Sequence, residues 1–262
     1  MSIKLNIVPN ELLAMYSQRM ETGVQERFVA LSDSELSMAT FSFYTSVSAV
    51  FSSKIEGEPI DLDSYIKHKR LGAHFLPDYT RKIDDLYEAY IFAQQHKLNK
   101  ANLLHAHALL TRNILQKGQQ GKIRAGNMFV ITQDGKIEYV AAAPDRVKAE
   151  MEALYQDIAT LLKSELSFNE VLFYAAMLHL VFVKIHPFED GNGRTSRLLE
   201  KWFIAQKLGP KAWFIQSEKN YYDQHQAYYS NIRRLGLEYD TLDYTQALPF
   251  TLMLPQSIQE KK

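Results

Sequence analysis

Apolar residues recur every three or four positions through most of the chain, which is the spacing of one face of an α-helix. The pattern is clear in three stretches: Leu86, Tyr90 and Ala93; Leu103, Leu110 and Ile114; and Met151, Leu154, Ile158 and Leu161. Gly209-Pro210 marks the end of one helix, and Pro255 marks where the last one finishes. The pattern therefore predicts an all-α fold.

One segment departs from this helical pattern. Residues 128–132 and 136–141 are rich in β-forming residues, and they flank Gln133-Asp134-Gly135, whose Asp-Gly pair suits a tight hairpin turn. A single β-hairpin in a helical body indicates that the hairpin has a task of its own. The alternative is a hairpin that only covers core.

The longest apolar run extends from Val171 to Val183 and has His179 inside it. A helix that spans a membrane needs about 18 such residues, so we interpret this run as a buried core helix. The N-terminal residues 1–6 lack the charged, apolar and small-residue regions of a secretory signal. We expect a cytoplasmic location and no membrane partner.

The amino-acid composition excludes several kinds of functional site. The 262 residues contain no cysteine, which excludes disulfides, a thiolate nucleophile and Cys-ligated metal centres. Thirty basic residues balance thirty acidic ones, so there is no overall positive field to recruit nucleic acid. Repeats and linker-like runs are absent from the sequence, and we expect residues 1–262 to form a single domain.

Twelve consecutive residues carry most of the candidate chemistry. Residues 186–197 read His-Pro-Phe-Glu-Asp-Gly-Asn-Gly-Arg-Thr-Ser-Arg. Pro187 is expected to stop the preceding helix near Ile185, which leaves His186 at its end with the ring facing a cleft. An imidazole, with an ordinary pKa of ~6.5, is suited there to act as a general base.

The second half of this segment is predicted to bind phosphate. Its tight turn consists of Gly191, Asn192 and Gly193. Such a turn gathers backbone N–H groups around an anion at the N-terminus of the following helix. Arg194 and Arg197 lie on one helix face and can reach the outer phosphates of a nucleotide, and Asp190 can hold Mg²⁺ across phosphate oxygens.

Each feature also has a simpler interpretation. A histidine at a helix end can be a partner of the helix dipole, a Gly-Asn-Gly turn can be only a turn, and both arginines can be surface charges paired with Glu200. The occurrence of base, acid, anion-binding turn and cations within twelve residues favours the phosphate site.

Residues 186–197 resemble the signature of the Fic family: His-Pro-Phe, a free position, Asp or Glu, Gly-Asn-Gly-Arg, two free positions, and Arg. Every fixed position is met. Gly121-Lys122-Ile123-Arg124 and Pro144 are also similar to the borders of the family's β-hairpin flap, placed here at about 121–144. The resemblance implies a Fic-type helical core with one flap, and a target protein docked on the hairpin at 127–141.

The resemblance also implies a reaction, the transfer of AMP from Mg²⁺-bound ATP to a Ser, Thr or Tyr hydroxyl of a protein. His186 would take the proton of the hydroxyl, Asp190 would hold Mg²⁺, and the amides of residues 191–193 with Arg194 would stabilise the phosphates. Arg197 would fix the γ-phosphate. The protein itself is a further acceptor to consider.

Tyr222 is matched by the resemblance to a ring that lies against the nucleotide base. Relatives often have an Asn seven residues later, where this chain has Tyr229, and this departure weakens an expectation of adenine selectivity. Taken singly, Tyr221, Tyr228 and Tyr229 are expected to be ordinary packing aromatics.

Residues 52–57, Ser-Ser-Lys-Ile-Glu-Gly, resemble the family's inhibitory motif and close a helix expected at about 35–57. Gly57 suits the position after a helix end, and Ser52 lies one turn before Glu56, where it can orient the carboxylate. A glutamate at this end of a helix interacts unfavourably with the helix dipole unless a cation pairs with it, and the resemblance implies that Arg197 is this cation. The alternative is that Glu56 is a solvated helix end.

Three other functions remain open from the sequence. The same site can run in reverse, with Glu56 orienting a water that removes AMP from a modified protein. It can also move another group, such as phosphocholine or UMP. A non-catalytic module that captures a partner strand on the hairpin edge is disfavoured by the intact His186 and Asp190.

Overall fold

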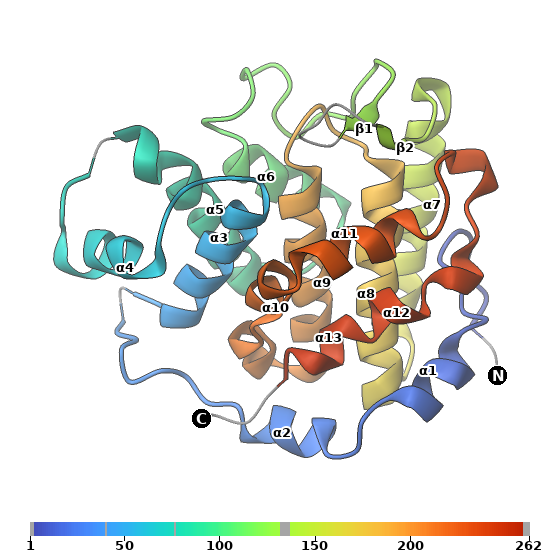
Figure 1. The fold of residues 1–262 in the computed structure, drawn as a ribbon, viewed down its shortest axis with the longest axis horizontal. Helices are drawn as coiled ribbons and strands as arrows, with labels where there is room; N and C mark the ends of the chain where they lie inside the picture. The colour runs from blue at the N-terminus through green and yellow to red at the C-terminus, as the bar shows by residue number, and fades with distance from the viewer. Residues whose placement is uncertain (1–2, 40, 76, 132–136, 259–262) are drawn as a thin grey trace.

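The protein is described by a computed structural model that covers residues 3–39, 41–75, 77–131 and 137–258. Its α-helices are α1 (Leu13–Arg19), α2 (Val24–Ala30), α3 (Phe43–Ile55), α4 (Leu62–Leu71), α5 (Pro77–Gln95), α6 (Lys100–Leu110), α7 (Pro144–Lys163), α8 (Phe168–Ile185), α9 (Asn192–Leu208), α10 (Ser217–Asp223), α11 (His225–Arg233), α12 (Leu248–Thr251) and α13 (Met253–Gln256) (Figure 1). Short 3₁₀ helices are η1 (Pro210–Phe214), η2 (Tyr239–Thr241) and η3 (Tyr244–Gln246), and the strands are β1 (Phe129–Ile131) and β2 (Ile137–Val140). The predicted helical fold with one hairpin is confirmed.

Helix α8 forms the centre of the core, between α7 and α9 (Figure 1). Every residue from Val171 to Ile185 is buried. Helix α8 has 18 residues and, by length and composition alone, could cross a membrane. However, 83% of this apolar stretch is buried inside the protein. The interpretation of this run as a core helix is confirmed.

Local signals explain where α8 starts and stops and where α9 stops. Ser167 begins α8 with a capping box, in which its side chain and that of Glu170 each bind the other's backbone N–H. Pro187 prevents α8 from continuing past Ile185, as predicted. Gly209 ends α9 with a φ of 89°, which glycine adopts readily.

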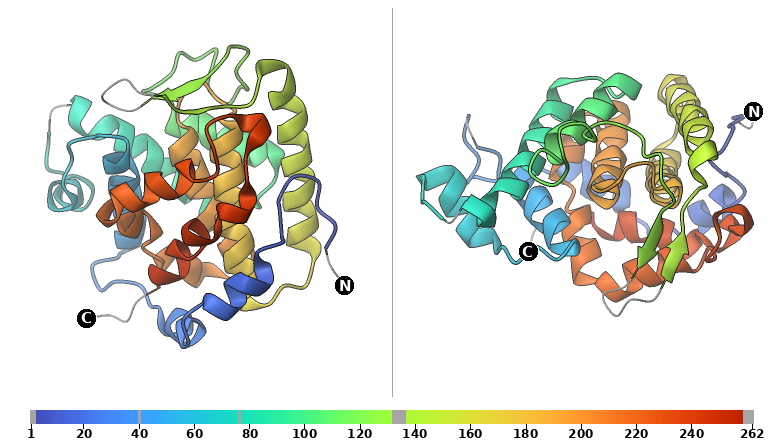
Figure 2. Two further views of the ribbon diagram at one scale, coloured as in Figure 1. Left: turned by 45° about the vertical axis from the view of Figure 1, so that its right-hand side comes forward. Right: turned by 90° about the horizontal axis from the view of Figure 1, so that it is seen from above.

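The hairpin lies at the end of the molecule where α8 stops and α9 begins (Figure 2). Its antiparallel strands pair Phe129 with Val140 and Val130 with Tyr139. The side chain of Tyr139 points inward and is buried, whereas Phe129 is exposed on the outer face. The described strands are shorter than predicted, and the predicted Gln133-Asp134-Gly135 turn lies outside the described residues.

Helix α3 is shorter than the predicted 35–57 segment. It begins at Phe43, because the side chain of Ser42 accepts a hydrogen bond from the N–H of Thr45 and caps the first turn. It ends at Ile55, and Gly57 follows with a φ of 88°. The predicted end of this helix is correct, and its predicted start was too early.

Candidate active site

His186 is the residue at which α8 ends. Its φ of 51° places it in the left-handed region, where a non-glycine residue costs roughly 1 to 2 kcal/mol. This turn directs the ring away from the helix axis and toward the hairpin. The sequence predicted the position of His186 at the helix end but not its strained backbone.

The ring of His186 is held through one of its two nitrogens. Nδ1 lies 3.2 Å from the carbonyl of Val183 and 3.1 Å from the hydroxyl of Tyr139 on β2. The Tyr139 hydroxyl donates to the same carbonyl at 3.1 Å. Because a carbonyl only accepts, these contacts favour a proton on Nδ1 and leave Nε2 as the basic nitrogen.

The environment keeps the ring of His186 neutral. Burial lowers its pKa to about 4, and the positive charge of Arg124 acts in the same direction. The hydrogen bond to Val183 and the carboxylates of Glu56 and Asp190 oppose this shift. At neutral pH the imidazole is therefore able to accept a proton.

The residues after His186 form a closed loop at the N-terminus of α9. The side chain of Asn192 accepts from the N–H of Phe188 at 2.9 Å and donates to its carbonyl at 2.8 Å. Gly191, with a φ of 80°, then starts α9, whose first backbone N–H groups give this end its partial positive charge. Asn192 thus shapes the loop with its side chain, and only its backbone N–H is available to an anion.

Two close approaches explain the glycines of this loop. A side chain at Gly191 would collide with Thr111 at the end of α6. A side chain at Gly193 would collide with the carboxylate of Glu56 and lie 3.1 Å from the guanidinium of Arg197. Gly193 therefore allows α3 and α9 to place opposite charges in contact above the loop.

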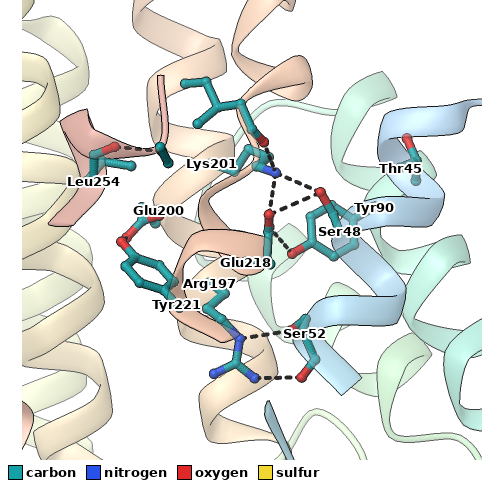
Figure 3. A network of polar contacts seen from close by, with 12 residues as sticks. Thr45, Ser48, Ser52, Tyr90, Arg197, Glu200, Lys201, Glu218, Tyr221 and Leu254 are labelled. Carbon is teal, nitrogen blue, oxygen red and sulfur yellow. Dashed lines mark hydrogen bonds and ion pairs between the residues drawn. The ribbon is translucent and has the colours of Figure 1, made fainter. Parts of the chain in front are cut away.

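Arg197 is 1% exposed and is held by the end of α3. Its Nη2 donates to Glu56 Oε1 at 2.6 Å. Nη2 also donates to the carbonyl of Ser52 at 3.0 Å, and Nε donates to the Ser52 hydroxyl at 2.8 Å (Figure 3). The prediction that Ser52 orients the carboxylate was wrong, because its hydroxyl binds the arginine instead. Burial acts to raise the pKa of Glu56, but Arg197 and Arg194 outweigh it and lower this pKa below its ordinary value.

A second buried contact joins the same two helices one turn away. Lys201 donates to the hydroxyl of Ser48 on α3 at 2.6 Å and to Glu218 at 2.5 Å. The hydroxyl of Tyr90 donates to the other oxygen of Glu218 at 2.6 Å (Figure 3). These buried polar contacts fix α3 against α9, so the position of Glu56 depends on the packing of the whole of α3.

Arg194 is also buried, with 4% of its surface exposed. Its Nη2 lies 3.6 Å from the carboxylate of Glu58, which binds Lys82 as well, and its Nη1 lies 3.9 Å from Asp190. The alternative that both arginines are surface charges paired with Glu200 is wrong. Glu200 is itself buried and contacts His179 at 2.7 Å.

A chain of buried hydrogen bonds connects Arg197 to His179 and Glu200. Its Nη1 donates to the Tyr228 hydroxyl at 3.2 Å, which lies 3.0 Å from Nε2 of His179. Nδ1 of His179 contacts Glu200, which also accepts from the Tyr221 hydroxyl at 2.8 Å. The expectation that Tyr228 is only a packing aromatic was wrong, because its hydroxyl binds Arg197.

His107 on α6 connects the loop between α8 and α9 to the segment before the hairpin. Its Nδ1 accepts from the N–H of Gly121 at 2.9 Å, so its Nε2 carries the proton and donates to the carbonyl of Asp190 at 2.9 Å. Burial lowers its pKa to about 4. Sequence reasoning missed this residue, since a histidine on a helical apolar face gives no signal of its own.

Asp190 is the predicted metal ligand, and its side chain is 54% exposed. One of its oxygens accepts from the N–H of Gly191 at 2.5 Å. Among the described residues no group of three or more acidic or histidine side chains could hold a metal by itself. A single carboxylate beside the predicted phosphate site fits Mg²⁺, which is usually bound by one or two carboxylates, water and substrate phosphates.

Tyr222 on α10 is partly buried and lies beside the last turns of α3. Its ring centroid is 5.5 Å from that of Phe51, and the ammonium group of Lys54 lies 4.8 Å above the ring. Tyr221 points the other way, into the core, where its ring is fully buried. The structure thus separates the two tyrosines, and the role of Tyr222 toward a nucleotide base stays a prediction.

Residues 97–204 match the model of the Fic/DOC family. Over this range, the chain is similar to the Fic/DOC family. The matched range runs from the start of α6 through the hairpin and α8 into α9, and so contains the loop built by His186, Asn192 and Gly193. The two strands of the hairpin therefore lie within the range that matches the family model.

Curated relatives are similar over parts of the chain. The protein adenylyltransferase Fic of Nematostella vectensis is 30% identical over 153 residues, 58% of this chain and 30% of that protein. The protein adenylyltransferase Fic of Aedes aegypti is 47% identical over 51 residues, 19% of this chain and 10% of that protein. The similarity thus spans less than a third of the length of these relatives.

Solved structures share the fold over nearly the whole chain. A Fic family protein from Desulfovibrio desulfuricans G20 has a TM-score of 0.75 at 20% identity, covering 97% of this chain and 75% of that one. A Fic domain containing signaling protein from Bacteroides thetaiotaomicron VPI-5482 has a TM-score of 0.64 at 19% identity, covering 95% and 92%. At these identities the similarity concerns the fold alone.

Proposed function

We propose that this protein transfers AMP from ATP to a hydroxyl side chain of a protein. The observation that carries the proposal is the position of the His186 imidazole, held through Nδ1, on the loop that leads into the N-terminal amides of α9 and two buried arginines. The adenylyltransferase names of the curated relatives agree with this choice of reaction. Target proteins would dock along the hairpin, and the chain itself is a further acceptor.

In the proposed reaction Nε2 of His186 takes the proton of the attacking hydroxyl. The hydroxyl oxygen forms a bond to the α-phosphorus of ATP, the bond from this phosphorus to the oxygen bridging the α- and β-phosphates breaks, and pyrophosphate leaves. The backbone N–H groups of Asn192 and Gly193 and the guanidinium of Arg194 stabilise the negative charge on the phosphates. The N–H of Gly191 joins them once Asp190 no longer accepts from it. Mg²⁺ held by Asp190 would neutralise further charge there.

Arg197 would bind the γ-phosphate, and Glu56 competes with it. While Nη2 of Arg197 donates to Glu56 at 2.6 Å, this donor is not available to a phosphate oxygen. ATP then lacks one of its cationic contacts, and we infer that the resting protein is inhibited by its own Glu56. Release needs only a rotation of the glutamate side chain, which is 27% exposed, because α3 itself is fixed by its buried contacts.

Removal of AMP from a modified protein is a second candidate for the same site. It is favoured by one observation, that the arginines keep the carboxylate of Glu56 ionised beside Gly193. An ionised carboxylate there could orient a water toward the phosphorus of an AMP group.

Labelled ATP tests the proposed transfer. The Glu56→Gly protein, incubated with Mg²⁺ and ATP labelled at the α- or the γ-phosphate, should place only the α-label on protein. His186→Ala in the same background should lower the rate by about 10²- to 10⁴-fold, the usual contribution of a general base. A γ-label on protein, or an undiminished rate without His186, would exclude this assignment.

A further inference from the structure

Arg124 occupies an unusual position between the catalytic loop and the hairpin. It lies in the segment that leads to β1, yet it is only 4% exposed. Its backbone N–H donates to the carbonyl of Pro187 at 2.9 Å. A residue at the border of the flap is thus hydrogen-bonded to the residue after the proposed base.

The side chain of Arg124 binds the carbonyls of the two residues before Pro187. Nε donates to the carbonyl of His186 at 2.7 Å, and Nη2 donates to that of Ile185 at 3.3 Å. Carbonyls at a helix C-terminus have no partner within the helix, and a cation there is favoured by the helix dipole. Arg124 therefore caps three consecutive carbonyls, those of residues 185–187, around the strained backbone of His186.

The remaining donors of the guanidinium reach both ends of the hairpin. Nη1 donates to the carbonyl of Gly126 at 2.6 Å, just before β1, and Nη2 donates to that of Ala142 at 2.5 Å, just after β2. A planar guanidinium presents five N–H donors in a fixed geometry, whereas an ammonium group cannot reach carbonyls on three segments in this way.

The hairpin in turn contacts the ring of His186. Tyr139 on β2 pairs with Val130 on β1, and its hydroxyl lies between the carbonyl of Val183 and Nδ1 of His186, at 3.1 Å from each. Displacing the hairpin would therefore withdraw a contact that holds the proton on Nδ1. Other charged groups that act on the ring are Arg124, Glu56 and Asp190.

We propose that Arg124 is a positioning residue that binds the end of α8 to both ends of the hairpin, so that the placement of the hairpin and the orientation and tautomer of His186 are coupled. The inference rests on the proposed function in one respect, that His186 is the base. A target segment that docks on the hairpin would then fix the base as well as its own hydroxyl.

Nuclear magnetic resonance of the free protein tests this coupling. With ¹⁵N-labelled histidine, the signal of His186 among the eight histidines is the one lost in His186→Gln. At pH 7.5 the wild type should show the tautomer protonated at Nδ1. Arg124→Gln should raise the share protonated at Nε2, and it should also speed amide exchange at Ala141, which donates to Met128 across the hairpin, by at least tenfold.

Two further variants make the test decisive. Arg124→Lys keeps the buried positive charge but not the planar donors, and it should show both changes even if Arg124→Gln does not fold. Arg27→Gln is the control, because Arg27 also donates to backbone carbonyls, those of Ile258 and Thr22, far from the hairpin. It should leave both signals unchanged.

Folded Arg124 variants that retain the wild-type tautomer and the wild-type exchange at Ala141 would overturn the inference. The same holds if Arg27→Gln produces equal changes, since the effect would then reflect a general loss of stability. Neither measurement uses nucleotide or target. A protein that shows the coupling but transfers no AMP would therefore contradict the proposed function and leave this inference standing.

Discussion

The carboxylate of Glu56 and the guanidinium of Arg197 are 2.6 Å apart, although 141 residues separate them in the chain. The pair joins the end of α3 to the first turns of α9, directly above Gly193. A glutamate at a helix C-terminus is unfavourable by a few tenths to about 1 kcal/mol, and this arginine supplies the compensating charge. The arginine therefore stabilises this end of α3. The same contact has a functional consequence, because it occupies a donor that is expected to bind phosphate.

The first prediction concerns Tyr228, whose hydroxyl accepts from Arg197 and lies against His179. Tyr228→Phe leaves two buried polar groups without this partner, so the free energy of unfolding should fall by about 1 to 3 kcal/mol. Urea unfolding measures the change. Tyr155→Phe is the matched control, because the buried hydroxyl of Tyr155 has no hydrogen-bond partner within the described residues. Equal losses in both variants would show that the hydroxyl of Tyr228 contributes nothing specific.

The second prediction concerns the stability of the fold in mild acid. Burial lowers the pKa of His107 and of His186 to about 4, whereas both titrate near 6.5 in the unfolded chain. Between these values the unfolded chain binds more protons, so the free energy of unfolding should fall as the pH drops from 7 toward 4. Each group should account for about 2 kcal/mol of this loss by pH 5.

Two histidine variants isolate this effect from the titration of carboxylates. His107→Gln should lose about 2 kcal/mol less stability than the wild type between pH 7 and pH 5, measured by urea unfolding. His105→Gln, which changes an exposed histidine on the same helix, should retain the full pH dependence. A His107→Gln protein with an unchanged pH dependence would mean that His107 is not held neutral by burial.

The third prediction separates the two functions proposed for Arg197. Arg197→Ala removes the partner of Glu56 and the γ-phosphate contact together, so it should not raise AMP transfer. The double variant with Glu56→Gly should transfer AMP at the rate of Arg197→Ala alone, because the two residues act as a unit. Rates of labelling from α-labelled ATP in the four proteins provide the test. If the double variant were as active as Glu56→Gly, Arg197 would have no part in binding ATP.

Local sequence signals predicted the parts of the site that are close in the chain. Pro187 predicted the end of α8, Gly57 predicted the end of α3, and the composition of residues 186–197 predicted where the candidate groups gather. In each case the determining residue lies within a few positions of the feature. Such features depend on backbone geometry that a short stretch of sequence specifies.

Contacts between distant segments were not predictable in this way. Tyr228 was expected to be a packing aromatic, and Tyr139 was only one position in a predicted strand. Their hydroxyl contacts with Arg197 and His186 arise from tertiary packing across 31 and 47 residues. Arg124 was recognised only as part of a flap border, since the carbonyls that it binds carry no residue-specific signal. Ser52 was placed correctly, but the geometry that turns its hydroxyl to the arginine belongs to the fold.

The most direct test of the account is the rate of AMP transfer by Glu56→Gly relative to the wild type. Freeing Arg197 for the γ-phosphate restores a charge-assisted contact of about 1.5 to 3 kcal/mol, which corresponds to roughly a ten- to 150-fold gain in productive ATP binding. Labelling from α-labelled ATP should rise by a factor in that range, and Glu165→Gly, a change at an exposed glutamate remote from the site, should leave it unchanged. If Glu56→Gly leaves transfer unchanged but abolishes the removal of AMP from a pre-modified protein, Glu56 positions a hydrolytic water and the inhibitory account is contradicted.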